Sequence, residues 1–435
     1  MKAVPMVLAL ALAGCVMRPE GEKAERDRVA AAGVEFHKPF ADRELSDLTQ
    51  GATLSTFLAH AEQANGALEA AFHGWEAALE KVPQASTQAT TAMVGLEHTL
   101  DGGSALDRTA LLLMNNTMAM ILWPGRLEAQ GEAALADARV AGAAFVRQRL
   151  RLQTQVSDAY YALALRDEEL ALLDRLERLL AVQVPSVAAR VRAGSAMQAE
   201  LLAAEVARDR VRAERAKLAG ERPALEAALR ALVGVGGDAN VPKPVLPPLT
   251  SLQPVERDVI ESVLANNAEV EMQRLEHAAA MAEVTMAEWE RVPEFSLSAT
   301  VMGTMSQTLG AAMTLPWLRG TAIEGAVRET EARVRAADAL RRQAGFDATA
   351  MAVRELAMLA AVEAEHAVLA ESLLPRLQQM GDVARAAWTA GGGKLTEWVA
   401  ATAMALETET ALARLRREHS LARARLQELL GGVAP

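Results

Sequence analysis

The sequence predicts a mainly α-helical chain with a small β part, in which one long-helix plan occurs twice. Three observations support this fold class: an internal duplication, helical stretches of unusual length, and two segments in which apolar and polar residues alternate. Only 3% of the 435 residues are aromatic, and the abundant Ala residues suit long helices that pack closely together.

Short motifs recur in the same order about 200 residues apart, which is the signature of an internal repeat. A Pro- and Gly-rich segment separates the two copies and reads as their linker, because that density of Pro excludes a helix or a central strand. The matching motifs are Asn65-Gly66-Ala67-Leu68 with Asn267-Ala268-Glu269-Val270, Arg192-Ala193-Gly194 with Thr389-Ala390-Gly391, and, more loosely, Leu232-Val233-Gly234 with Leu430-Gly431-Gly432.

Both copies share one expected layout: a first helix, a β-hairpin, a very long helix, a Gly-centred tip and a last helix. The very long helix would span roughly 100 Å, which the first and last helices match when stacked end to end. Pro185 and Pro375 are expected to interrupt the two long helices. The expected domains are a signal peptide at 1–14, an acylated tether at 15–50, the first repeat at 51–234, the linker at 235–254 and the second repeat at 255–432. The first helix, hairpin and tip lie at 53–85, 86–123 and near Gly194 in the first repeat, and at 255–291, 294–317 and near Gly391 in the second.

The N-terminus has the features of a bacterial lipoprotein signal. Lys2 precedes an apolar run from Ala3 to Leu12, which suits a signal peptide and is too short to cross a bilayer as a helix. The run ends in Leu12-Ala13-Gly14-Cys15, which matches a lipobox, so we expect Cys15 to carry acyl chains such as palmitate. Val16 stands where an Asp would favour the inner membrane, which indicates the outer membrane. The alternative is an ordinary signal peptide with an incidental Cys.

Composition and motifs exclude several other classes of function. The formal net charge of −11 argues against a nucleic-acid partner, since phosphate binding needs clustered Lys and Arg. After the signal, no apolar run reaches the roughly eighteen residues of a membrane-spanning helix, so contact with a bilayer would need strands. The His residues are scattered, and Glu363 with His366 is an isolated pair, so we expect no metal site. No nucleophile–base pattern is visible, and we expect neither an enzyme nor a cofactor.

Two alternating segments predict β-hairpins. In the second repeat the alternation runs from Phe295 to Val301 and returns from Thr308 to Leu315. In the first repeat it lies between Thr90 and Leu122, around the turn signal Asp101-Gly102-Gly103-Ser104. We expect one side of these strands to face lipid, and packing on a soluble core is the alternative. The residues expected to face lipid are Phe295, Leu297, Val301, Leu309, Met313 and Leu315 in the second repeat and Leu112, Met114, Met118 and Met120 in the first.

The hairpins also predict self-association, because four strands are too few to close a barrel. Three chains would supply twelve strands, an even number within the range of bacterial outer-membrane barrels. The strands have about eight to ten residues, close to the length of a tilted membrane strand. We therefore expect a homotrimer whose twelve-stranded β-barrel meets outer-membrane lipid.

Residues from roughly 50 to 432 resemble the TolC-like family of outer-membrane efflux proteins. The resemblance rests on the duplicated plan, on the lipobox that acylated members share, and on motifs at the strand-to-helix junction and at the helix tips. These motifs are Leu122-Trp123-Pro124-Gly125-Arg126-Leu127 at the junction, Arg192-Ala193-Gly194 with Glu200 at the first tip, and Ala390-Gly391 with Glu397-Trp398-Val399 at the second.

The resemblance implies a trimeric α-barrel that continues the β-barrel across the periplasm. Its tips, at Arg192, Ala193, Gly194, Ala390 and Gly391, would meet a periplasmic adaptor protein and, through it, an inner-membrane pump. Glu397, with Glu200 at the matching position, would ring the periplasmic mouth as a gate. The family's usual Asp is here Glu397, and its further acid is replaced by Ala400, so one ring is missing. The alternative is that Glu397 is a solvated acid favoured by a helix N-terminus.

These features together predict a passive, lipid-anchored outer-membrane exit duct that extends into the periplasm as part of a tripartite export system. The pump and adaptor would select the cargo, so drugs, metal ions and proteins all remain open. The alternative is a non-conducting coiled-coil structural lipoprotein of the cell envelope. That alternative needs no paired lipid-facing strands, which makes the hairpins the deciding feature.

Overall fold

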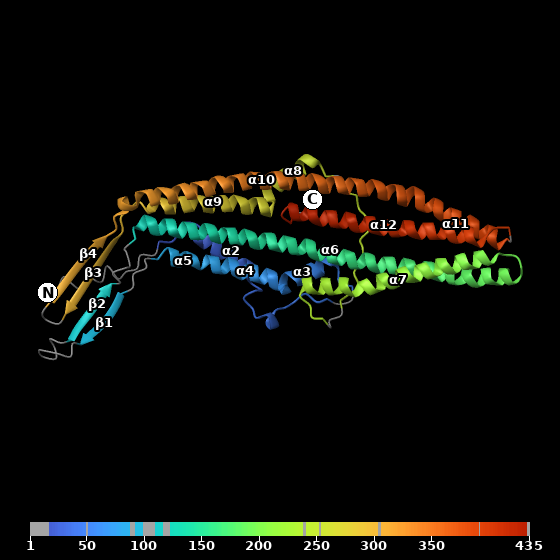
Figure 1. Ribbon diagram of the computed structural model, residues 1–435, viewed down its shortest axis with the longest axis horizontal. Helices are drawn as coiled ribbons and strands as arrows, with labels where there is room; N and C mark the ends of the chain where they lie inside the picture. The colour runs from blue at the N-terminus through green and yellow to red at the C-terminus, as the bar shows by residue number, and fades with distance from the viewer. Residues whose placement is uncertain are drawn as a thin grey trace. The chain divides into compact units, whose positions relative to one another are not determined.

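The computed structural model describes residues 17–48, 51–87, 92–98, 109–115, 122–237, 241–251, 254–302, 306–390 and 392–432. It confirms a mainly helical chain with a small antiparallel sheet (Figure 1). None of the helices in these ranges is both long and apolar enough to cross a membrane. The helices are α2 (Glu22–Ala32), η1 (Phe40–Asp42), α3 (Leu54–Ala64), α4 (Gly66–Leu79), α5 (Lys81–Ala85), α6 (Pro124–Arg192), α7 (Gln198–Val233), α8 (Glu256–Asn266), α9 (Ala268–Trp289), η2 (Pro316–Arg319), α10 (Gly320–Ala367), η3 (Val368–Leu373), α11 (Leu374–Thr389) and α12 (Leu395–Leu429), and the strands are β1 (Ala92–His98), β2 (Thr109–Asn115), β3 (Phe295–Met302) and β4 (Ser306–Met313).

The chain divides into two compact units, and each unit contains segments of both repeats. Unit 1 consists of Met1–His37, Ala70–Val146 and Ala268–Gly345, and unit 2 consists of Lys38–Glu69, Arg147–Asn267 and Phe346–Pro435. The two sequence repeats are therefore not two separate compact bodies. Each unit instead combines corresponding parts of the first and second repeat.

Unit 1 packs aromatic side chains between α4 and the first part of α6. Trp75 and Phe145 stack with ring centroids 5.8 Å apart, and Phe72 lies 6.0 Å from Phe145. Gly142 on α6 lets Trp75 approach, because a Cβ there would lie 2.8 Å from the indole ring. The aromatic residues between α4 and α6 thus form a dense local core in unit 1.

The segment that precedes the first repeat is folded against these helices. Met17 donates its backbone N–H to the Ser86 carbonyl at 3.1 Å. The Trp75 indole donates to the carboxylate of Glu25 on α2 at 2.9 Å, and both side chains are buried. The described residues up to His37 therefore belong to the body of unit 1, although the sequence predicted a tether.

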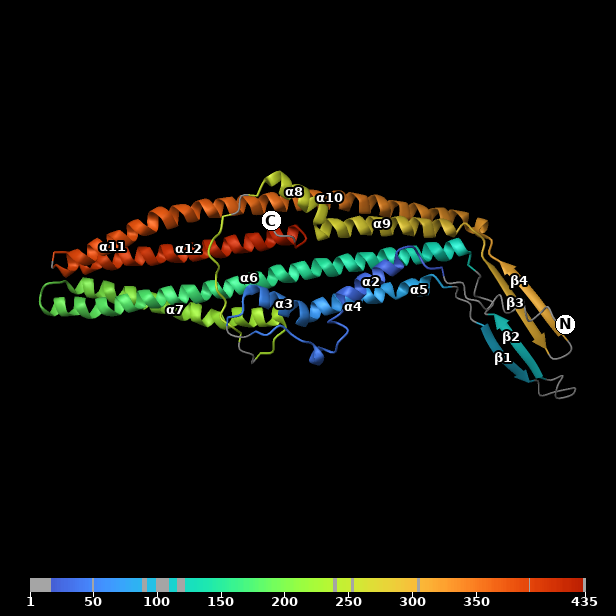
Figure 2. The same cartoon turned by 180° about the vertical axis from the view of Figure 1, so that it is seen from behind.

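Unit 2 joins long helices through apolar contacts and ion pairs. Helix α11 packs along α12, and α3 packs against α7 (Figure 2). Ion pairs connect α6 to both neighbours: Arg222 on α7 lies 2.7 Å from Asp167, and Arg414 on α12 lies 2.8 Å from Glu169. In each pair the carboxylate is buried and the arginine is partly exposed, so these contacts are only partly screened by water.

The first helix of each repeat is interrupted by an asparagine, where the sequence predicted a continuous helix. Asn65 separates α3 from α4, and Asn267 separates α8 from α9. The Asn65 Oδ1 accepts the backbone N–H groups of Ala67 and Leu68 at 3.0 and 3.1 Å. This is the bonding pattern of an N-cap, which favours the start of a new helix over continuation of the previous one.

The amide nitrogen of each of these asparagines reaches the end of the last helix in its own repeat. Asn65 Nδ2 donates to the Leu232 carbonyl at 2.8 Å, and Asn267 Nδ2 donates to the Leu429 carbonyl at 3.1 Å. Such bonds satisfy carbonyl groups that have no partner inside the helix. The same junction is therefore built twice, once in each repeat.

A glycine with positive φ completes each junction. Gly234 has φ of 80° and Gly431 has φ of 71°. A Cβ on Gly234 would lie 2.6 Å from the Ala64 carbonyl oxygen, and one on Gly431 would lie 2.4 Å from that of Asn266. Because Gly234 and Gly431 are equivalent in space, the sequence match that paired Gly234 with Gly432 was one residue out of register.

Removing either asparagine should destabilise the fold. We expect Asn267→Ala and Asn65→Ala each to cost about 2 kcal/mol, because each removes a cap and a long-range hydrogen bond. The urea midpoint followed by circular dichroism measures this loss. Asn266→Ala is the matched control, since Asn266 is exposed and bonds Ser262 in its own helix. Equal midpoints for Asn267→Ala and Asn266→Ala would show that the junction contributes nothing.

The prolines in the two long helices differ in their effect on helix continuity. Helix α6 runs for 69 residues and continues through Pro185. In the second repeat, α10 passes into the six-residue π-helix η3, and Pro375 follows within the first turn of α11. A π-turn changes the hydrogen-bonding pattern next to the proline. The expected interruption is therefore found at Pro375 and not at Pro185.

Candidate functional site: the sheet and the helix tips

The sheet consists of the two predicted hairpins side by side, in the order β1-β2-β3-β4, with every neighbouring pair antiparallel. In the second hairpin Phe295 lies opposite Met313 and Leu297 opposite Ala311. Directly opposed residues share a face of an antiparallel sheet. This register places Phe295, Leu297 and Met313 on one face, as the alternation predicted, and Ser296 on the other.

The pairing of the two hairpins changes the assignment for β2. Leu111 lies opposite Val301, so position 111 shares the face of Val301 and Phe295. Positions Leu112 and Met114 then belong to the opposite face, together with Ser296, and not to the face that the sequence assigned to them. The physical reason is that residues 111–114 are all apolar, so their alternation does not identify a face.

The register gives the sheet one face whose middle positions are apolar, which we call face A. Its apolar positions are Ala92, Val94, Leu96, Leu111, Leu113, Val301, Ala299, Leu297, Phe295, Leu309, Ala311 and Met313. Its other positions lie near the strand ends and are polar: His98, Thr109, Asn115 and Gln307. The opposite face, face B, contains Ser296, Ser298, Thr300, Thr308 and Glu97 among its positions. Met118 and Met120 lie outside the described residues, and so does Cys15.

A polar network holds the sheet to the helices of unit 1. The Trp123 indole donates to the Pro293 carbonyl at 2.7 Å, and Arg126 at the start of α6 forms an ion pair with Glu294. The Glu294 N–H donates to Thr314 Oγ1 at 2.9 Å, and the Thr314 N–H returns a bond of 2.9 Å to the Glu294 carbonyl. The junction motif around Trp123 thus fixes the strands by bonds to the residues that flank β3 and β4.

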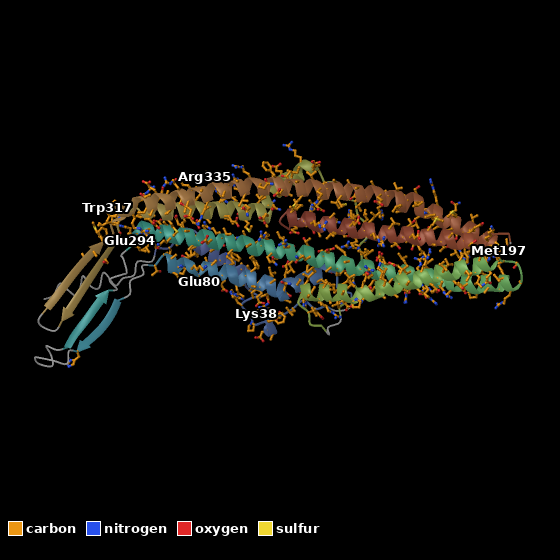
Figure 3. The ribbon with its side chains drawn as sticks, in the orientation of Figure 1. Lys38, Glu80, Met197, Glu294, Trp317 and Arg335 are labelled. Carbon is orange, nitrogen blue, oxygen red and sulfur yellow. The ribbon has the colours of Figure 1, made fainter. Side chains whose placement is uncertain are left out.

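Large apolar side chains are exposed where β3 and β4 meet the helices, near Glu294 and Trp317 in Figure 3. Trp317 is 61% exposed and Leu318 is 74% exposed. Exposed aromatic and aliphatic clusters mark interaction surfaces, and Trp belongs at membrane–water boundaries. We call this cluster the base patch; it consists of Trp123, Phe295, Met313, Leu315, Trp317 and Leu318.

Two features of this region were missed by sequence reasoning. Leu318 was not singled out, although it adjoins Trp317 in an apolar run that the same reasoning could have included. The Arg126–Glu294 ion pair joins residues far apart in the chain, and no local pattern indicates it. Both residues of the pair are about one-fifth exposed, so the pair is partly shielded from water.

The first helix tip is a tight, self-bonded turn in unit 2. Arg192 ends α6, Gly194 has φ of 68°, and Arg192, Ala193 and Gly194 are all exposed. Ser195 donates from both its N–H and its hydroxyl to the Arg190 carbonyl, at 2.9 and 3.1 Å. The positive φ is the reason that a glycine is needed there, as the sequence predicted.

The second tip is described only in part. Ala390 is exposed, and Gly391 lies outside the described residues. Gly393 packs on the preceding helix so closely that a Cβ would lie 2.8 Å from the Ala387 carbonyl carbon. Close approach therefore requires a glycine at position 393, while the positive φ predicted for Gly391 stays a prediction.

The two candidate gate residues occupy matching positions. Glu200 is the third residue of α7, and Glu397 is the third residue of α12. Glu200 is half-buried and Glu397 is exposed. A carboxylate in the first turn is favoured by the helix dipole, so helix stabilisation alone would account for both positions. Their role as a gate stays a prediction.

Aromatic and aliphatic side chains pack the two tips together within unit 2. Trp388 on α11 stacks on Trp398 of α12, with centroids 5.6 Å apart and ring planes 20° apart. Val399 of α12 packs with Leu180 and Val187 of α6 in one buried cluster. Glu397 is therefore carried by a helix turn whose next two residues are anchored. Within the described ranges, no three His, Cys, Asp or Glu residues gather as they would around a metal ion.

Comparison with known proteins gives a family match for the second repeat. Residues 259–432 match the family described as outer membrane efflux protein. No curated protein matches the chain by sequence. The match covers the repeat that contains β3, β4 and the second tip, and it agrees with the resemblance to TolC-like proteins. An efflux protein family also agrees with the expectation that the chain is not an enzyme.

Solved structures share the fold over nearly the whole chain. A membrane protein from Pseudomonas aeruginosa is similar with a TM-score of 0.74 and 20% identity, over 89% of this chain and 92% of that chain. The outer membrane protein VceC from Vibrio cholerae gives 0.71 and 19%, over 87% and 96%. The outer membrane channel CmeC from Campylobacter jejuni gives 0.74 and 14%, over 92% and 91%. The chain therefore has the fold of TolC-like outer-membrane efflux channels.

Proposed function

We propose, from the efflux family match in its second repeat and from its TolC-like fold, that this chain is one subunit of a trimeric outer-membrane exit duct. The observation that supports this function best is the sheet, whose face A is apolar in the middle of all four strands and adjoins the exposed base patch. A face of this kind needs an apolar environment, and outer-membrane lipid would supply it.

The ends of the sheet support assembly of several copies. β1 and β4 are its outer strands, so each has one side without a partner strand in the described part of the chain. Open strand edges favour pairing with another chain. Pairing β1 of one subunit with β4 of the next in three copies would give a closed barrel of twelve strands. Face A would then meet lipid, and the hydroxyl-bearing face B would line the lumen.

The position of Met17 supports a lipid anchor at Cys15. Met17 is bonded to Ser86, a few residues before β1, and Gly131 leaves room for Pro19 and Ser86 beside α6. Cys15 lies outside the described residues and precedes Met17 by two positions in the sequence. Acyl chains on Cys15 would anchor this end of the chain in the outer membrane.

The helix tips are the proposed contact and gate of the duct. The exposed residues Arg192, Ala193, Gly194 and Ala390, with Gly391, would bind a periplasmic adaptor that couples the duct to an inner-membrane pump. Glu397, with Glu200, would narrow the mouth and favour cations. The non-conducting structural lipoprotein is the less favoured reading, because it gives face A and the base patch no role.

Single-channel conductance in planar bilayers tests this function. Well-folded wild-type trimers should conduct, and Glu397→Ala should raise conductance and weaken cation preference, because a ring of charge is removed. Glu226→Ala is a control for loss of a helix carboxylate away from the tips. Absence of current from folded trimers contradicts the duct. Unchanged selectivity in Glu397→Ala contradicts the gate and leaves the duct intact.

A further inference from the structure

The two helix tips lie side by side in unit 2 and expose apolar side chains (Figure 1, Figure 2). Met197, directly before α7, is 69% exposed (Figure 3), and Val383 of α11 is 63% exposed. Exposed apolar clusters mark interaction surfaces, and methionine is enriched in them. The tips therefore carry an apolar surface suited to a protein partner.

The charge of the chain changes sign at the tips. The whole chain has a formal net charge of −11. Residues 190–200 and 385–397, which include the tips, contain two carboxylates, Glu200 and Glu397. The four cations in the same ranges are Arg190, Arg192, Arg385 and Lys394. The tips are thus locally positive on a chain that is negative as a whole.

Two of these cations are bonded within their own tip, and two are free. Arg190 donates to a backbone carbonyl of its own turn at 3.3 Å, and the Arg385 guanidinium lies 6.0 Å from the centre of the Trp398 ring. Arg192 and Lys394 are exposed, and the side chain of neither forms a hydrogen bond or ion pair with a residue that the structure describes. Both can therefore bind a carboxylate that a partner supplies.

Helix stability accounts for only one of the two free cations. Arg192 ends α6, where the helix dipole favours a positive charge. Lys394 is instead the N-cap of α12, where the same dipole disfavours a positive charge. Farther from the tips, Arg212 of α7 lies 2.8 Å from Glu177 of α6, whereas Lys394 has no such ion pair in the described part of the chain. A negatively charged partner would explain the position of Lys394.

We propose that Arg192 and Lys394, beside the apolar surface of the tips, form a docking site for a partner whose end carries carboxylates. This inference rests on the proposed function and names the chemistry of the adaptor that the tips would bind. The net negative charge of the chain repels an acidic partner, while the tips attract it. Charge thus guides the partner to the tips, where contact with the apolar side chains then holds it.

Binding of synthetic helical hairpins to the full-length protein in lipid discs tests this docking site. The hairpins share one sequence and differ only in a turn that carries Glu, Gln or Lys residues. We expect the Glu hairpin to bind about tenfold more tightly than the Gln hairpin, and the Lys hairpin to bind least, because the free cations meet the added carboxylates. Calorimetry measures the dissociation constants, and added salt should weaken the Glu hairpin most.

Charge reversal separates a docking role from a structural one. Lys394→Glu and Arg192→Glu should each weaken binding of the Glu hairpin about tenfold and strengthen binding of the Lys hairpin, which loss of structure cannot do. Arg257→Glu is the matched control. Arg257 is also exposed and without an ion pair in the described part of the chain, but it lies at the start of α8. The control should leave all affinities unchanged.

Three results overturn the docking site. Equal affinities of the Glu and Lys hairpins show that the tips do not select charge, and absence of binding by the Glu hairpin shows that they do not dock it. Loss of the wild-type oligomer in Lys394→Glu or Arg192→Glu, measured by light scattering, assigns these cations to contacts between copies of the chain. Conductance tests the duct separately, so none of these results decides the proposed function.

Discussion

Val301→Arg is expected to prevent the chain from inserting stably into a lipid bilayer. Val301 lies opposite Leu111 on face A of the sheet. Arginine on the lipid face of a membrane barrel costs about 2–4 kcal/mol near the bilayer midplane and about 1 kcal/mol or less near the interfaces. Val301 lies one residue before the end of β3, so we expect a cost between these values, which recurs in every subunit of an oligomer. Folding into phospholipid vesicles, followed by urea titration of the inserted protein, measures this loss.

Neighbouring positions supply the controls for this substitution. Thr300→Arg lies on face B, and we expect it to insert with little loss. The same experiment tests the corrected register of β2: Leu113→Arg should be as damaging as Val301→Arg, while Leu112→Arg should be tolerated. Equal losses on both faces would show that neither face is selected by lipid, and the proposed barrel would then be wrong.

Glu69→Gln should be among the most destabilising single substitutions in unit 2. Arg43 has a side chain only 1% exposed and places two guanidinium nitrogens 2.5 and 3.0 Å from the Glu69 carboxylate. It also donates to the carbonyls of Lys38 and Gln63, each at 3.1 Å. Removal of the carboxylate takes away the negative charge that Glu69 places against a buried cation, which we expect to cost about 3 kcal/mol.

Urea unfolding followed by circular dichroism checks this value. Glu80→Gln is the matched control, because Glu80 also pairs with an arginine, Arg26 at 2.6 Å, but is 56% exposed. An exposed pair contributes at most about 1 kcal/mol, so the control should shift the midpoint only slightly. A similar shift in both variants would mean that burial of Arg43 does not govern the strength of its pair.

The sequence predicted those features that repeat along the chain. Duplication, helix length and alternation correctly indicated the fold class, both hairpins and the face that contains Phe295 and Met313. Which residues of β2 lie on face A could not be predicted, because four consecutive apolar residues show no alternation. It became clear only from the pairing of Leu111 with Val301, which is a contact between the two repeats.

Long-range contacts explain the other differences between the sequence predictions and the structure. Asn65 marked the repeat but did not reveal a helix break, because its partner Leu232 is 167 residues away. Glu363 looked like an isolated neighbour of His366, whereas the structure pairs it with His419, 56 residues further on. The predictions for Cys15 and Gly391 fall outside the described residues, so both remain predictions.

The doubled junction of asparagine and glycine has a consequence for how its contribution to folding can be measured. Asn65 with Gly234 and Asn267 with Gly431 build the same corner at corresponding positions of the two repeats. One molecule thus contains two versions of the same junction. The effect of a substitution in one junction on stability can be compared with the effect of the same substitution in the other.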